Sequence, residues 1–104
     1  MNRWNISKIF EVAVWARDAR CVYCDVRFTA DKTDRENTAT WEHIINDETI
    51  ITPENIALCC CSCNASKSTR PLEDWTKSVY CVKKDINYNT VAKVIKVALT
   101  TSNN

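Results

Sequence analysis

Two pairs of cysteines share the Cys-x-x-Cys spacing that turns two thiolates toward one metal ion. The first pair is Cys21 and Cys24, and the second lies in a run rich in cysteine where only Cys60 and Cys63 are three positions apart. Each pair supplies two soft sulfur ligands. Together they predict a closed, tetrahedral, structural zinc site with bonds of about 2.3 Å and no open position for chemistry.

Two other uses of these thiols stay open. A redox-active pair would explain one Cys-x-x-Cys and leave the second without a role. An iron–sulfur cluster is also held by four thiolates. Of the remaining cysteines, Cys59 ends the apolar stretch that begins at Ile56, and we expect it to be a buried small hydrophobe. The sequence predicts no role for Cys61 or Cys81.

A set of polar residues stands between and after the two cysteine pairs. The only histidine, His43, follows Glu42, and Asn55 comes twelve residues after the histidine. Asn64 follows the last cysteine of the second pair directly, and Lys67 comes three residues later. In order and spacing this resembles the HNH endonucleases, whose Cys-x-x-Cys precedes Asp-His-Ile/Val, Asn-Leu/Ile and Cys-Asn-x-x-Lys. The resemblance covers about residues 15–76, including the segment Arg-Pro-Leu-Glu-Asp-Trp that starts at residue 70.

The resemblance implies a small zinc-stabilised α+β domain. Its treble-clef-like ββα-metal core has two antiparallel strands joined by a long loop and followed by a helix. Helices would flank this core at both ends of a single domain, 1–104, with a C-terminal helical extension at about 77–100.

The resemblance also implies a divalent-metal-dependent DNA endonuclease that hydrolyses phosphodiester bonds. His43 would be the general base, since an unperturbed imidazole titrates near pH 6.5. Glu42 and Asn64 would hold magnesium or manganese, which prefer oxygen ligands. Asn55 would brace the loop and the histidine. The predicted phosphate contacts are Lys67 and Arg70.

Three positions depart from the family pattern without removing a required function. Glu42 stands where the family has aspartate, which keeps the carboxylate but lengthens the side chain by one methylene. Asn46 replaces a frequent proline. Asn64 replaces the final histidine, a variant that the family also uses.

The charge distribution is uneven although the formal net charge is only +1. Residues 37–60 contain four acidic residues and no Lys or Arg, whereas residues 61–104 contain seven basic and three acidic ones. This division suits a cation site beside a phosphate-binding face. The small net charge also suits a subunit that nicks DNA only inside a larger assembly, such as a phage packaging complex, because a stand-alone nuclease often shows a larger basic excess.

Length and hydropathy restrict the remaining alternatives. The 104 residues fit one domain. No apolar run approaches the roughly 18 residues of a membrane span, and no signal peptide is recognisable. We therefore expect a protein of the cytoplasm, or of the host cell's cytoplasm if it is phage-encoded.

Expected partners are DNA and either a second copy of the chain or a packaging or restriction partner. A catalytically idle zinc module that binds nucleic acid or protein is the competing class. Such a module has no need of His43, Asn55 and Asn64 together.

Local patterns predict the elements that position these residues. Apolar spacing predicts helices at 6–19 and from 89 or 90 to 99, with a polar tail at 100–104. A further helix is expected at 64–68, and Pro71 at a first helical position predicts one from there to Cys81. A loop is expected at 25–39, with β-branched strands at 38–42 and 49–52. The chain has no glycine, so its ten asparagines are expected to fill turns and left-handed positions.

Overall fold

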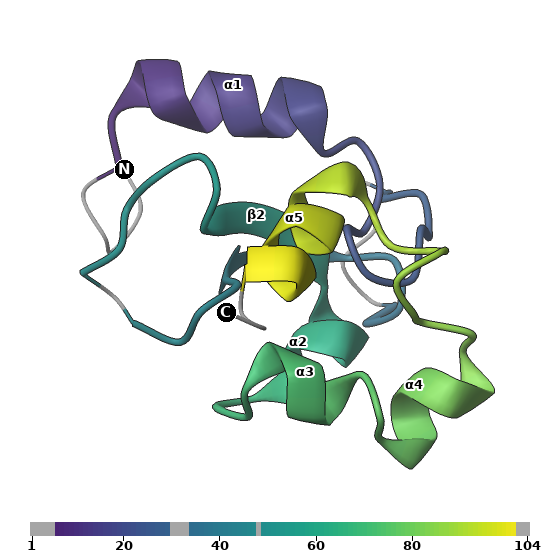
Figure 1. The fold of residues 1–104 in the computed structure, drawn as a ribbon. Helices are drawn as coiled ribbons and strands as arrows, with labels where there is room; N and C mark the ends of the chain where they lie inside the picture. Colours follow the sequence, from purple (N-terminus) through teal and green to yellow (C-terminus); the bar gives the residue numbers. More distant parts are fainter. Residues whose placement is uncertain (1–5, 30–33, 48, 102–104) are drawn as a thin grey trace.

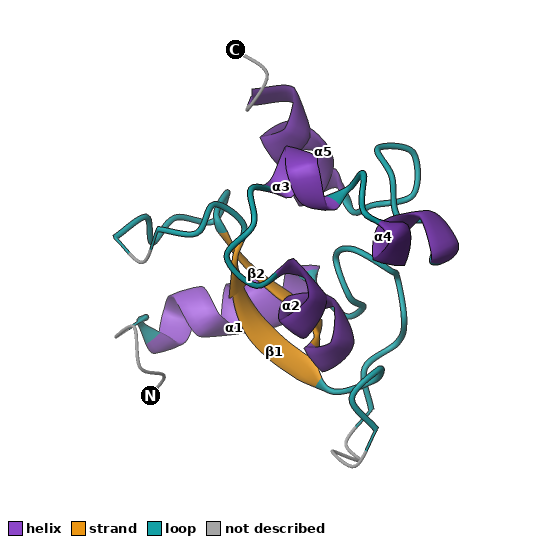
Figure 2. Ribbon diagram, turned by 90° about the horizontal axis from the view of Figure 1, so that it is seen from below, coloured by secondary structure: helices purple, strands orange, loops and turns teal. Residues whose placement is uncertain are grey.

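A two-stranded antiparallel sheet lies at the centre of the domain, with helices on both of its faces (Figures 1 and 2). The computed structural model describes residues 6–29, 34–47 and 49–101. Strand β1 (Ala39–His43) pairs with strand β2 (Ile56–Cys60) along their whole length. The chain is therefore a small α+β domain, as predicted from its sequence.

The alternation of side chains along the two strands separates the two faces of the sheet. On one face Trp41 meets Trp15 edge to face, with ring centroids 6.4 Å apart, and Ile56 and Leu58 join the same apolar cluster. On the other face Thr40 contacts the helix that follows β2. A hairpin only two strands wide therefore needs a cover on each face to be stable.

Helix α1 (Lys8–Arg17) covers the first face (Figure 1). Ser7 caps it by accepting a hydrogen bond from the amide of Phe10, and Val14 is buried against the sheet. The predicted helix is confirmed, but Ile9, one of the apolar residues at helical spacing, is 84% exposed. The sheet is too narrow to cover more than one stripe of the helix.

Helix α2 (Cys61–Lys67) covers the second face and begins at the residue after β2 (Figure 2). It is one turn longer at its start than the predicted segment. Trp75 and Tyr23 pack beside it, both fully buried, with ring centroids 4.8 Å apart. The Trp75 indole donates a hydrogen bond to the Ser66 hydroxyl, which fixes the next segment of the chain against α2.

The helix predicted from Pro71 to Cys81 is two short helices, α3 (Leu72–Trp75) and α4 (Val79–Lys83). Ser78 ends the continuity, because its side chain caps α4 by accepting a hydrogen bond from the Cys81 amide. The break lets both Trp75 and Cys81 enter the core, where each is 0% exposed.

The strand predicted at 49–52 is wrong. The second strand is Ile56–Cys60, a run whose five residues are all buried. Residues 49–52 belong instead to the loop that joins the strands, and the side chains of Thr49 and Ile51 are exposed. Their β-branched character alone cannot form a strand, because no neighbouring strand pairs with them.

In the described part of this glycine-free chain, the left-handed backbone positions are taken by residues other than asparagine. Among the described residues, the left-handed positions belong to Asp25, Ser68 and Asp85, with φ of 66°, 50° and 57°. Asp25 follows the first cysteine pair, and Ser68 ends α2. Asparagines do occupy turns, but the expectation that they take the left-handed positions is wrong for the part of the chain that is described.

Helix α5 (Lys93–Thr101) ends the described part of the chain. Its Ile95, and Val91 just before the helix, are buried in the main apolar core. The helix starts later than predicted because Asn87 and Thr90 close a hydrogen-bonded turn immediately before it. None of the helices in the described segments is long and apolar enough to cross a membrane.

Candidate metal centre and the residues around His43

Two distant turns of the chain bring four cysteines together. The turn after α1 contributes Cys21 and Cys24, and the end of β2 with the start of α2 contributes Cys60 and Cys63. Their four sulfur atoms all lie within 4.8 Å of one another. The pairing read from the Cys-x-x-Cys spacing is confirmed as the set of cysteines that converges.

The dimensions of this cluster suit a tetrahedral metal site. Four sulfurs bound to zinc at about 2.3 Å lie about 3.8 Å from each other, and the sulfurs of Cys24 and Cys60 are 3.8 Å apart. The amide of Cys24 donates to the Cys21 sulfur at 3.5 Å, and the amide of Cys63 to the Cys60 sulfur at 3.4 Å. Such donors favour the thiolate form that binds metal. The four cysteines could therefore hold a metal ion such as zinc.

Hydrogen bonds among the four sulfurs shift their pKa values in opposite directions. Bonds with Cys21 lower the pKa of Cys60 to about 7 and lower the pKa of Cys24 still further, whereas bonds with the other cysteines of the cluster raise the pKa of Cys21 and of Cys63. The Tyr80 hydroxyl donates to the Cys63 sulfur at 3.4 Å from helix α4. Outer hydrogen bonds of this kind orient ligands and tune their affinity for metal.

The other three cysteines stand outside the cluster. Cys59 is 0% exposed, and burial raises the pKa of its thiol well above the usual range. The buried small hydrophobe expected at Cys59 is what the structure contains. Burial also raises the pKa of Cys81, which lies in the core. Cys61 is partly exposed at the start of α2.

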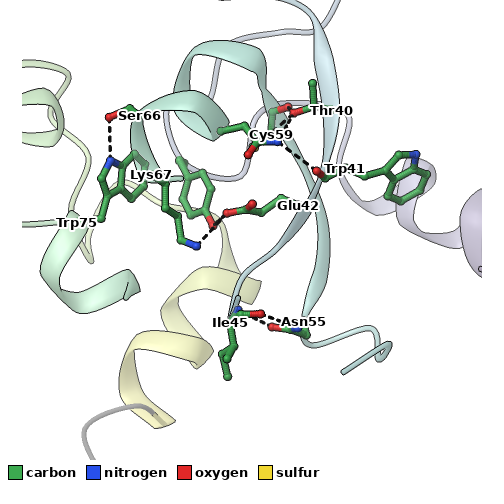
Figure 3. A network of polar contacts seen from close by, with 11 residues as sticks. Thr40, Trp41, Glu42, Ile45, Asn55, Cys59, Ser66, Lys67 and Trp75 are labelled. Atoms are coloured by element: carbon green, nitrogen blue, oxygen red, sulfur yellow. Dashed lines mark hydrogen bonds and ion pairs between the residues drawn. The ribbon is translucent and has the colours of Figure 1, made fainter. Parts of the chain in front are cut away.

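His43 lies at the last position of β1, opposite Ile56 of β2, and is 6% exposed. Asn55 holds the loop that begins directly after it. The Asn55 side chain accepts a hydrogen bond from the Ile45 amide at 2.6 Å and donates to the Ile45 carbonyl (Figure 3). It also donates to the Ile50 carbonyl. Its backbone carbonyl also accepts from the Ile44 amide. Asn55 therefore fixes the backbone on both sides of the loop that follows His43.

Glu42 points to the opposite side of β1, into a buried cluster of polar groups. Its Oε2 accepts a hydrogen bond from the Tyr23 hydroxyl at 2.7 Å. The same oxygen lies 3.2 Å from the Lys67 Nζ (Figure 3). The side chains of Glu42 and Lys67 are 6% and 1% exposed. Burial raises the pKa of Glu42, and the positive charge of Lys67 and the Tyr23 hydrogen bond act in the opposite direction.

Asn64 is tied to β1 beside Glu42. Its amide nitrogen donates to the Thr40 hydroxyl at 3.0 Å and to the Trp41 carbonyl at 3.2 Å. Both bonds use the side-chain nitrogen. Neither involves the Oδ1 oxygen, which is the atom that a cation would bind. Asn64 and Glu42 thus lie on the same face of the sheet, yet the carboxylate already has Lys67 as its positive neighbour. The divalent cation expected on Glu42 and Asn64 stays a prediction, and it does not fit this arrangement unless Lys67 moves.

The two residues predicted to contact phosphate are in different environments. Arg70 is exposed, and its guanidinium donates to the Ser66 carbonyl at the end of α2. Lys67 is buried against Glu42. Its phosphate contact also stays a prediction, since it requires the side chain to leave the carboxylate.

No family model, curated protein or solved structure matches this chain. The chemistry of the site therefore has to be inferred from the geometry of its own residues.

Three contributors to this region were missed by the sequence analysis. Tyr23 and Tyr80 reach Glu42 and the Cys63 sulfur through their hydroxyls. Asp18 is 4% exposed and accepts from the Leu58 amide, which joins the end of α1 to β2. The position of Tyr23 inside the first Cys-x-x-Cys was a signal that it lies close to this region. The other two contacts depend on packing that local spacing does not reveal.

Proposed function

We propose that the chain is an HNH-type DNA endonuclease that hydrolyses phosphodiester bonds with His43 as the general base. The observation that carries this proposal is the chain order of the central unit. A strand ending in His43, a loop braced by Asn55, a second strand and a helix bearing Asn64 follow one another, and the cysteine cluster joins that helix start to the N-terminal turn.

Each residue of this unit has a chemical task in the proposed reaction. An imidazole at the end of a strand can take a proton from water at neutral pH. A divalent cation, magnesium or manganese, would supply charge neutralisation at the leaving oxygen when bound. Arg70 is exposed beyond the end of α2 and is available to a DNA phosphate. The cysteine cluster would act as a scaffold that fixes these groups.

The test is cleavage of supercoiled plasmid by zinc-loaded protein with magnesium or manganese. We expect nicked or linear product, and a loss of at least about 100-fold in rate for His43→Ala at unchanged zinc content. Asn46→Ala changes an exposed residue of the same loop and should cleave normally. Equal rates for wild type and His43→Ala would exclude the assigned base.

One observation favours a second candidate function, a catalytically idle zinc module that binds nucleic acid or protein. The carboxylate expected to hold the cation is buried and already paired with Lys67. If the zinc-loaded protein binds DNA without cutting it under any divalent cation, this second function replaces the first.

A further inference from the structure

Tyr88 lies in the turn before α5 and is 52% exposed. It borders two hollows in the surface of the domain. The first, of about 460 Å³, lies between α3 and α5 and has Lys77 and Leu99 in its walls (Figure 2). The second, of about 350 Å³, is lined by Lys93 and Lys96 of α5. An exposed aromatic ring thus stands beside two recesses whose walls carry lysines.

The turn that carries Tyr88 is held firmly at both ends. The Asn87 amide donates a hydrogen bond to the Thr90 hydroxyl at 2.9 Å, and the Thr90 amide donates to the Asn87 carbonyl at 3.0 Å. Ile86 and Val91, just outside these two residues, are buried in the core. The backbone around Tyr88 therefore has little entropy left to lose when a ligand binds to the ring.

The lysines around Tyr88 are not neutralised by acidic neighbours. The Lys96 Nζ lies over the Tyr88 ring, 5.9 Å from its centroid, which is within the range of a cation–π interaction. None of Lys77, Lys93 and Lys96 makes an ion pair with another described residue. Among the described residues that line the two hollows, Glu73 is the one acid. The two recesses therefore favour an anionic ligand.

An aromatic ring flanked by cations matches the chemistry of single-stranded nucleic acid. Unpaired bases stack on aromatic side chains, and lysines contact the phosphates between them. The bases of a duplex are covered by their neighbours, so an exposed ring can stack only on an unpaired base. An acidic peptide would use the lysines but would leave the Tyr88 ring without a stacking partner.

A third hollow connects this region with the loop that follows His43. It measures about 380 Å³ and is lined by Ile44 and Ile45 of that loop and by Ala98 of α5. Glu73 lines both this hollow and the one between α3 and α5. The recesses along α5 therefore adjoin one another from the loop after His43 to Tyr88.

We propose that Tyr88, Lys93 and Lys96 form a stacking site for an unpaired nucleotide of single-stranded DNA. The base stacks on the Tyr88 ring, and the two ammonium groups contact the neighbouring phosphates. This inference deepens the proposed function and rests on it for the choice of DNA. It adds that the DNA held along α5, beside the loop after His43, carries an unpaired base.

The test measures binding of a fluorescein-labelled oligothymidylate strand to zinc-loaded protein by fluorescence anisotropy, without magnesium or manganese. Tyr88→Ala should raise the Kd about tenfold, because the stacking surface is lost, whereas Tyr88→Phe keeps the ring and should bind within about twofold of wild type. Asn89→Ala is the matched control, since it changes an exposed residue of the same turn. It should bind as wild type does.

The charged part of the site is tested by the dependence of this binding on salt. Lys96→Gln should weaken binding and reduce the slope of log Kd against log salt by about 0.7, the value for one lost phosphate contact on a single strand. Lys83→Gln is the control, because Lys83 is exposed on α4 and lines neither hollow. Equal slopes for the two variants would overturn the role of Lys96.

A duplex of the same length separates stacking from general attraction to DNA. Tyr88→Ala and Tyr88→Phe should bind the duplex equally. Equal single-strand affinities of Tyr88→Ala and Asn89→Ala, or an equal loss for single strand and duplex in Tyr88→Ala, would overturn the proposal. Tighter binding of oligouridylate than of oligothymidylate through Tyr88 would overturn the assignment to DNA.

The strand-binding assay contains no divalent cation, so its result is separate from that of the plasmid assay. A chain that binds the strand through Tyr88 without cutting plasmid would retain the stacking site and lose the nuclease. A chain that cuts plasmid but binds the strand equally well with Tyr88→Ala would retain the nuclease and lose the stacking site.

Discussion

The two polar clusters beside α2 differ in how their charge is balanced. Four sulfurs converge within 4.8 Å at the start of the helix, a set that a metal ion would complete. At the end of the same helix, one carboxylate is already balanced by Lys67 of the same chain. The first cluster would be balanced as thiolates by a bound metal, whereas the charge of the second is balanced within the protein alone.

The largest effect is expected at the cysteine cluster. Cys60→Ser should unfold the domain, because a structural zinc contributes on the order of 10 kcal/mol to folding in small domains. Circular dichroism and thermal unfolding measure the loss. Cys61→Ser changes the adjacent cysteine, which lies outside the cluster, and should stay folded. The opposite pattern would show that the wrong cysteine has been assigned.

The second effect concerns the buried ion pair of Glu42 and Lys67. Glu42→Gln leaves the Lys67 ammonium buried without its counter-charge, and we expect a loss of about 3–5 kcal/mol in the free energy of unfolding. Urea denaturation of zinc-loaded protein measures it. Changing both residues, as Glu42→Gln with Lys67→Met, should recover most of the loss.

Glu54→Gln is the matched control for this change, since Glu54 is exposed in the loop before β2. It should alter stability by less than about 0.5 kcal/mol. If Glu42→Gln is as mild as Glu54→Gln, the ion pair contributes nothing, and the contrast between the two clusters fails.

A smaller effect is expected where the loop meets His43. Asn55→Ala removes three side-chain hydrogen bonds and leaves their backbone partners unsatisfied, at a cost of about 1–3 kcal/mol. Hydrogen exchange should speed up at the Ile45 amide, because in the wild type this amide donates a hydrogen bond to the Asn55 side chain. Asn46→Ala is the control. Unchanged exchange at Ile45 in Asn55→Ala would show that the loop is held by other contacts.

The smallest effect is expected at Tyr80, whose hydroxyl contacts the cysteine cluster. Tyr80→Phe removes the hydroxyl that donates to the Cys63 sulfur, and zinc affinity should fall about tenfold, at the lower end of such effects. Competition with a chelator measures it. Tyr88→Phe, at a side chain that is 52% exposed, should leave the affinity unchanged. Equal zinc loss from both variants would show that the Tyr80 hydroxyl does not contribute to zinc affinity.

The features that follow from local spacing could be predicted from the sequence. The register of Cys60 with Cys63 depends on a three-residue interval, and strand β1 is a short β-branched and aromatic run. The strand expected at 49–52 was wrong because strand formation also needs a partner, and β1 pairs with Ile56–Cys60 instead.

The environment of Lys67 lay beyond the sequence because it depends on contacts between distant residues. Lys67 was expected to contact phosphate, and lysine side chains are usually exposed. Its burial requires Tyr23 and Glu42, which stand 44 and 25 positions earlier, to meet it under the sheet. The same holds for Tyr80, since a break between α3 and α4 that spacing did not predict brings its hydroxyl to the Cys63 sulfur.

The most direct test of the difference between the clusters is native mass spectrometry of wild-type protein loaded with zinc and manganese. After mild treatment with EDTA we predict one zinc retained per chain and all manganese lost. This is the behaviour expected of a closed thiolate centre beside a carboxylate that is already paired with its own lysine. A folded chain without zinc, or manganese retained as firmly as zinc, would contradict it.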